Sequence, residues 1–144
     1  MPLSKHHIDR QDFETKVDFT RIKRDLIGGF SEIVFAYVLG SAAKSGWIKK
    51  QSDFDLAVYF SVKPDLRALS DLIGVVESSI RNIRCDLGIL NDADPVYCFE
   101  SLKGRLLFTR DEEVWLQFYT KTCREYESTL FHYHRQRMYR LETP

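Results

Sequence analysis

Two neighbouring segments with β-strand patterns constrain the fold of this chain more than any other feature. Residues 33–39 are a nearly unbroken apolar run rich in residues that favour strands, and they predict a strand buried on both faces of its sheet. Residues 53–60 resume the β pattern, with the second, fourth, sixth and eighth side chains all apolar and on one face. A sheet buried in this way needs helices packed against it.

Helical patterns surround these strands. The clearest one begins at Pro64 and Asp65 and continues to Ile83 with nearly ideal amphipathic spacing. The remaining patterns predict a helix from Phe19, strands over residues 84–90 and 105–109, a short helix over residues 95–102, and a last helix from Asp111 to about residue 131.

These elements predict an α/β (α+β) fold, in which a short mixed β-sheet is flanked by helices and a long C-terminal helix closes the domain. With 44% apolar residues, the chain can form a single domain over residues 1–144. We expect residues 1–15 to be flexible and residues 132–144 to form a basic, aromatic tail after the last helix. Two interpretations of the tail stay open, namely contact with RNA or an acidic partner, and a solvated helix end.

Charge and cysteine content exclude several classes of protein. Lysine plus arginine and aspartate plus glutamate both number 21, so no overall attraction to nucleic acid or an anionic membrane is expected. No apolar run approaches the roughly 18 residues that a membrane helix needs. Cys85, Cys98 and Cys123 are an odd number of widely spaced cysteines, which indicates reduced thiols and a cytoplasmic protein.

Three aspartates are the candidate metal ligands. Asp53 and Asp55 lie two positions apart on a predicted strand, so their carboxylates leave the same face with Cα atoms about 6 to 7 Å apart. Such a pair suits divalent cations in phosphoryl transfer, whereas a solvated strand face is the alternative for an isolated pair. Asp86 is a third carboxylate in an otherwise apolar segment, where an unpaired charge would be costly, and it needs either a cation or an ion pair with Arg84.

The Gly40-Ser41 turn is the candidate phosphate site. Glycine lets backbone N–H groups approach phosphate oxygens, and the Ser41 hydroxyl adds a donor. Lys44 follows in the same loop as a phosphate contact or as an ordinary surface lysine. Three interpretations of Trp47, in the same loop, stay open: a lid over the nucleotide, an apolar contact for a partner, or a packed loop residue.

The combination of these features resembles the DNA polymerase β-like nucleotidyltransferases, and most of all the minimal nucleotidyltransferases, over about residues 19–130. The resemblance rests on Gly40-Ser41 at the end of a strand, on the segment Ser-Asp-Phe-Asp-Leu-Ala-Val over residues 52–58, and on Asp86 one strand later. It implies a nucleotidyltransferase fold and enzyme. Its implied catalytic and metal-binding residues, holding two Mg²⁺ ions, are Asp53, Asp55 and Asp86, and its implied ATP-binding residues are Gly40, Ser41, Lys44 and Ser52.

Residues 91–110 also resemble the minimal nucleotidyltransferases of prokaryotic toxin–antitoxin pairs. In those pairs the partner is a helical HEPN-domain ribonuclease. The resemblance implies an antitoxin that transfers AMP from Mg-ATP to a tyrosine of this toxin, as part of a cytoplasmic hetero-oligomer that binds neither a membrane nor nucleic acid directly.

One segment departs from the family pattern. The loop over residues 42–52 is one residue longer than is common, and it carries Lys44-Ser45-Gly46 where the family commonly has Arg-Gly. Two other functions therefore stay open, namely a non-catalytic antitoxin that acts by binding and occlusion, and a small-molecule nucleotidyltransferase that modifies antibiotics.

Overall fold

A four-stranded mixed sheet forms the centre of the computed structural model, which describes residues 13–142. Its strands are β2 (Ile33–Val38), β4 (Phe54–Phe60), β5 (Cys85–Ile89) and β6 (Arg105–Thr109), in the spatial order β5-β4-β2-β6. Strand β2 is antiparallel to both β4 and β6, whereas β4 and β5 are parallel. The prediction of a short mixed sheet is confirmed.

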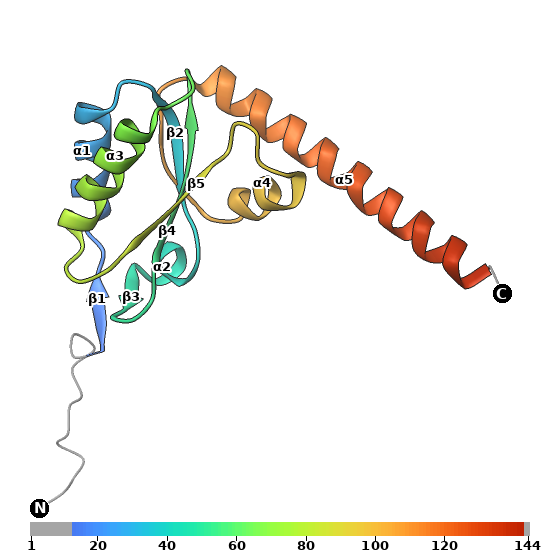
Figure 1. Ribbon diagram of the computed structural model, residues 1–144, viewed down its shortest axis with the longest axis horizontal. Coiled ribbons are helices and arrows are strands. Elements are labelled where there is room, and N and C mark those ends of the chain that lie inside the picture. The colour runs from blue at the N-terminus through green and yellow to red at the C-terminus, as the bar shows by residue number, and fades with distance from the viewer. Residues whose placement is uncertain (1–12, 143–144) are drawn as a thin grey trace, which may run out of the picture.

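Helices cover both faces of this sheet (Figure 1). On one face, α1 (Phe19–Gly29) and α3 (Leu66–Ser79) pack against the apolar side chains of β4, including Phe54, Leu56 and Val58. On the other face, α4 (Pro95–Leu102) and α5 (Glu112–Glu142) pack against a smaller core around Phe35 and Tyr37. Because helices cover both faces of the sheet, β2 carries apolar side chains on both of its faces.

The segment between β2 and β4 contains structure that the sequence patterns did not reveal. Gly40 is followed by a short helix, α2 (Ser41–Ser45), and by β3 (Trp47–Lys49), which pairs with β1 (Glu14–Lys16) in a second, two-stranded sheet. Trp47 is thus a half-buried strand residue opposite Lys16. The expectation of a flexible segment over residues 1–15 mostly concerns residues 1–12, outside the described residues, whereas Glu14 and Thr15 lie in β1.

Two helix ends differ from the sequence predictions. Helix α3 ends at Ser79 instead of continuing to Ile83, and Asn82 adopts a positive φ of 60°, which asparagine tolerates better than most residues. Ile80 and Ile83 lie after the end of the helix but are both buried. Apolar residues are therefore needed there, and the apolar pattern extends past the helix.

Helix α5 was expected to end near residue 131, but it continues to Glu142. The residues from 131 onward include helix formers such as leucine, arginine, glutamine and methionine, and no glycine or proline occurs before Pro144. The predicted basic tail over residues 132–144 is therefore, as far as residue 142, the exposed end of this helix, which extends away from the sheet (Figure 1).

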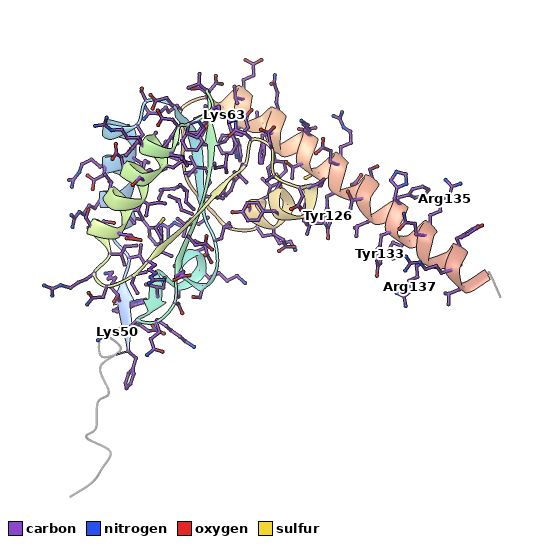
Figure 2. All side chains as sticks on the ribbon, viewed as in Figure 1. Lys50, Lys63, Tyr126, Tyr133, Arg135 and Arg137 are labelled. Atoms are coloured by element: carbon purple, nitrogen blue, oxygen red, sulfur yellow. The ribbon has the colours of Figure 1, made fainter. Side chains whose placement is uncertain are left out.

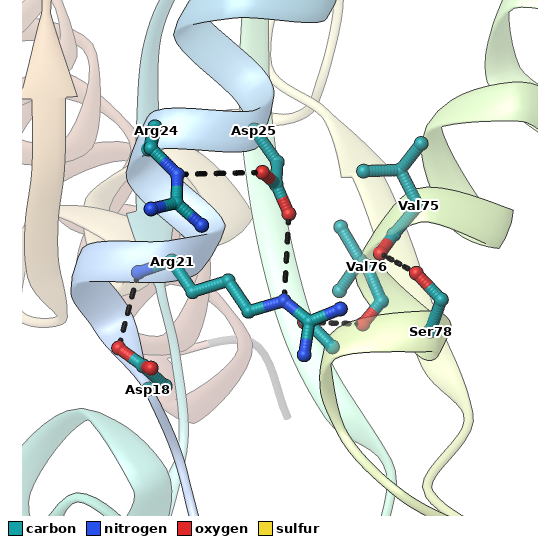
Figure 3. A network of polar contacts seen from close by, with 8 residues as sticks. Asp18, Arg21, Arg24, Asp25, Val75, Val76 and Ser78 are labelled. Carbon is teal, nitrogen blue, oxygen red and sulfur yellow. Dashed lines mark hydrogen bonds and ion pairs between the residues drawn. The ribbon is translucent and has the colours of Figure 1, made fainter.

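Polar contacts fix the helices at their ends. The Asp18 carboxylate caps α1 by accepting from the Arg21 N–H, and Asp25 lies within ion-pair distance of Arg21 and Arg24 (Figure 3). At the other end of α1, the Arg110 guanidinium donates to the carbonyl oxygens of Ile27 and Phe30, which joins the helix to the end of β6.

No helix within residues 13–142 is long and apolar enough to cross a membrane. Cys85, Cys98 and Cys123 are all free thiols, as expected. Burial raises the pKa of Cys85 to about 12, so this thiol is not reactive at neutral pH.

Replacing Gly74 by alanine should stabilise the protein. Gly74 is exposed in the interior of α3, and a β-carbon there would meet no atom within 4 Å. Alanine is favoured over glycine in a helix by about 1 kcal/mol, so the free energy of unfolding should rise by roughly that amount. Urea unfolding of both proteins measures the difference, and a decrease would contradict the open environment described for this position.

Candidate active site

Asp55 and Asp86 face each other across two neighbouring strands. Asp55 is the second residue of β4, and the parallel register places it directly beside Asp86 on β5. The side chain of Asp55 is half-buried, and that of Asp86 is exposed. The sheet thus joins two of the three predicted metal ligands.

Asp53 adds a third carboxylate beside Asp55 and Asp86, and we call these three residues the acidic edge. Asp53 is exposed, immediately precedes β4, and contributes its charge to the field at Asp55. Partial burial raises the pKa of Asp55 above its ordinary value, and the charges of Asp86 and Asp53 raise it further. Among the ion pairs of residues 13–142, none involves any of these three aspartates.

This excess of negative charge fits a divalent cation. Carboxylate oxygens are the preferred ligands of Mg²⁺, and no basic side chain neutralises the three groups in the described part of the chain. Across residues 13–142, however, no three acidic, histidine or cysteine side chains are arranged as a finished metal cluster. The metal site over Asp53, Asp55 and Asp86 stays a prediction that the donor chemistry supports.

One argument for Asp86 was wrong. The apolar residues around it indicated a buried strand in which an unpaired carboxylate would be costly. Strand β5 is instead the edge of the sheet, and Asp86 is exposed to solvent, so burial does not demand a partner there. The predicted alternative, an ion pair with Arg84, is also absent from the described residues.

Raising the pH should destabilise the metal-free protein more than it destabilises the metal-free Asp55→Asn variant. The folded state holds the Asp55 proton more tightly than the unfolded chain, whose aspartates titrate near a pKa of about 3.9. The contribution of Asp55 to stability is therefore fully present below that value and is lost as the pH rises through the raised pKa of Asp55. Urea unfolding in a chelator between about pH 4 and pH 8 measures the effect, and parallel curves for both proteins would contradict it.

The Gly40-Ser41 turn lies directly against this acidic edge. Gly40 has a φ of 74°, a conformation that favours glycine, and a β-carbon there would lie 3.2 Å from Asp55 Oδ2. The backbone N–H of Leu39 donates to the carbonyl oxygen of Asp55 over 2.9 Å. The backbone conformation thus favours glycine, the carboxylate beside it leaves little room for a β-carbon, and the predicted phosphate turn and metal ligands are brought together.

A groove of about 430 Å³ opens beside this turn. Its lining includes three of the predicted nucleotide contacts, Gly40, Ser41 and Lys44. Ser52, the fourth, lies outside the groove, in a turn where its N–H donates to the carbonyl oxygen of Lys49. The groove also contains residues that the sequence analysis missed, namely Glu100, Lys103 and Gly104.

Tyr97 is a further residue that sequence patterns did not reveal. Its hydroxyl lies directly over Gly88, where a β-carbon would overlap it, and Gly88 is two residues from Asp86 on the same face of β5. Burial raises the pKa of Tyr97, and the charges of Asp86 and Asp55 raise it further. The only sequence signal was the glycine within a predicted strand, which is typical of a close approach by another group.

Comparison with known protein families finds a match that spans the candidate site. The family profile described as Polymerase beta, Nucleotidyltransferase matches residues 21–113, a range that includes all three aspartates and the groove. No curated protein matches the chain.

Several solved structures are similar in fold. A mutant of the MntA-HpeT toxin–antitoxin is 22% identical, with a TM-score of 0.68, covering 85% of this chain and 95% of that chain. A toxin–antitoxin with AMP-PNP is 23% identical, with a TM-score of 0.67 and the same coverage. A tri-AMPylated Shewanella oneidensis HEPN toxin in complex with MNT antitoxin contains a chain 21% identical, with a TM-score of 0.60, covering 84% of this chain and 95% of that one.

Proposed function

Because the chain belongs to the polymerase β nucleotidyltransferase family, we propose that it transfers AMP from Mg-ATP to a tyrosine hydroxyl of a HEPN-type ribonuclease toxin and thereby acts as its antitoxin. The observation that carries this proposal is the contact between the two halves of the site. Gly40, at the phosphate turn, lies against Asp55, which faces Asp86 in the neighbouring strand.

The similar structures support the choice of nucleotide and acceptor. One contains AMP-PNP, an ATP analogue, and another contains an AMPylated HEPN toxin together with an MNT antitoxin. The free thiols of Cys85, Cys98 and Cys123 fit the reducing cytoplasm in which we place the chain.

Asp53, Asp55 and Asp86 would hold the divalent cations, of which we propose two. When bound, these ions would neutralise the triphosphate and stabilise the charge that develops during transfer. The exposed Asp86 is accessible to an incoming tyrosine, and we assign it the role of accepting the proton from the attacking hydroxyl. Gly40 and Ser41 would bind phosphate oxygens, with Lys44 adding a positive charge at the groove.

The projecting end of α5 is the surface we assign to the partner. Leu130, Phe131, Tyr133 and Met138 are all exposed there, and Tyr133 and Arg137 lie on the same side of this helix (Figure 2). Exposed apolar side chains with basic neighbours are typical of a protein-binding surface. An antitoxin that acts by binding alone would use the same surface, so this feature by itself does not separate the two mechanisms.

Transfer of label tests the proposal. The chain is incubated with Mg²⁺, the purified HEPN toxin and ATP labelled at the α-phosphate, and the modified residue is located by mass spectrometry. Label on a toxin tyrosine supports the proposal. Toxin inhibition without label would instead support occlusion, and protection of bacteria against an antibiotic panel would support a small-molecule transferase.

A further inference from the structure

The groove beside Gly40 contains a basic side chain that the family resemblance did not suggest. Lys103 caps the C-terminus of α4 and is far along the chain from Lys44 on α2, yet both lysines line the same groove. The volume of about 430 Å³ lies within the range typical of small-molecule sites. The fold therefore brings together two cations at the turn where phosphates would bind.

Close packing of the next residue holds Lys103 in this place. A β-carbon at Gly104 would overlap the carbonyl oxygen of Val38 and lie 2.8 Å from Leu39 Cδ2, so the chain passes directly against the end of β2. The Gly104 N–H also donates to the carbonyl oxygen of Ser101 over 3.0 Å. The position of Lys103 next to Gly40 is thus set by backbone packing.

Lys103 has an exchangeable partner. Its ammonium group lies 3.1 Å from Glu100 Oε1, and the side chains are 59% and 54% exposed. Exposed pairs of this kind contribute little to stability, and a phosphate oxygen is an equally good acceptor with a higher charge nearby. Glu100 also lines the groove, where its carboxylate would repel a polyphosphate.

Gly40 adjoins both this groove and the carboxylates. A β-carbon at Gly40 would lie 3.2 Å from Asp55 Oδ2, and Gly40 itself lines the groove. A nucleotide whose reacting phosphorus lies at the aspartates can therefore extend its remaining phosphates past Gly40 toward the two lysines. A nucleoside monophosphate has no group that would reach them.

We infer that Lys103 is a second cationic contact, beside Lys44, for the terminal phosphates of the nucleoside triphosphate, and that Glu100 competes with these phosphates for the Lys103 ammonium group. This inference rests on the proposed function, because it places the reacting phosphorus at the three aspartates. It assigns to the pair Glu100 and Lys103 the selection of triphosphates over monophosphates.

Calorimetric titration of the full chain with Mg-ATP and with AMP tests this role. Lys103→Gln should weaken ATP binding by about 5- to 10-fold and AMP binding by less than about 2-fold, since only ATP reaches the lysine. Glu100→Gln should tighten ATP binding by about 2- to 5-fold. The matched control is Lys121→Gln, which removes a lysine paired with Glu125 on α5, outside the groove, and should change neither affinity.

Unchanged ATP binding in Lys103→Gln, or equal weakening of ATP and AMP, would overturn the inference. If that variant does not fold, Glu100→Gln tests the inference instead. Tighter ATP binding by this variant would support the inference, and unchanged binding would overturn it. Transfer to the toxin is measured in parallel. ATP binding that depends on Lys103 but leads to no transfer would overturn only the proposed function. Transfer that does not depend on Lys103 would overturn only the inference. A chain that binds no ATP would overturn both.

Discussion

Asp55→Asn should reduce transfer of AMP to the toxin by roughly 10³-fold while the protein remains folded. Asp55 connects the carboxylates of the candidate site with the turn at Gly40. It is the register partner of Asp86, lies in the field of the Asp53 charge, and its carboxyl group lies against Gly40. Asparagine has nearly the same shape but one less anionic ligand for a cation. Its neutral amide also removes the cost of burying a charge and the repulsion from Asp86 and Asp53, which together raise the pKa of Asp55, so we expect no loss of stability.

Single-turnover transfer of labelled AMP measures this effect, with thermal unfolding as the control for folding. Asp71→Asn is the matched variant, because Asp71 is an exposed aspartate on α3, away from the acidic edge. It should transfer AMP at the rate of the unmodified chain. Transfer by Asp55→Asn at a comparable rate would contradict the assignment of the site.

The same variant separates catalysis from occlusion. Asp55 is on β4 and the proposed partner surface is on the end of α5, so Asp55→Asn should still bind the toxin. Toxin that is bound but remains an active ribonuclease would support neutralisation by AMP transfer. Full inhibition by the inactive variant would support an antitoxin that acts by binding.

Gly104→Ala should lower the free energy of unfolding by about 1 to 3 kcal/mol, the cost typical of overpacking in a well-packed region. The new β-carbon would overlap the Val38 carbonyl oxygen and lie 2.8 Å from Leu39 Cδ2 and 3.1 Å from the Ser101 carbonyl oxygen. Two of these three atoms belong to the backbone and cannot rotate away. The start of β6 must therefore move from the end of β2, next to Gly40.

Urea unfolding measures the loss, and the Gly74→Ala variant provides a control of opposite sign at an open position. Because the same movement displaces Lys103 and the Gly40 turn, the KM for ATP should rise as well. A Gly104→Ala protein as stable as the original would show that β2 and β6 are not packed as closely as described.

Local patterns were sufficient for most of the fold. The apolar run over residues 33–39, the alternation in residues 53–60 and the stripe of α3 each depend on side chains only a few positions apart. Element boundaries were less accurate where the apolar pattern and the backbone disagreed. Ile80 and Ile83 are buried outside the helix that their spacing predicted, and α5 continues after its apolar face ends.

The sequence by itself therefore determined the elements of the sheet and the chemical types at the site: a glycine turn, two aspartates two positions apart and a third on a later strand. Only the tertiary structure decided that β5 is an exposed edge, that Asp55 and Asp86 are in register, and that Lys103 reaches the turn at Gly40. Strand order and register depend on pairings between distant segments, and the approach at Gly104 depends on packing against the end of β2. Neither leaves a periodic signal in the chain.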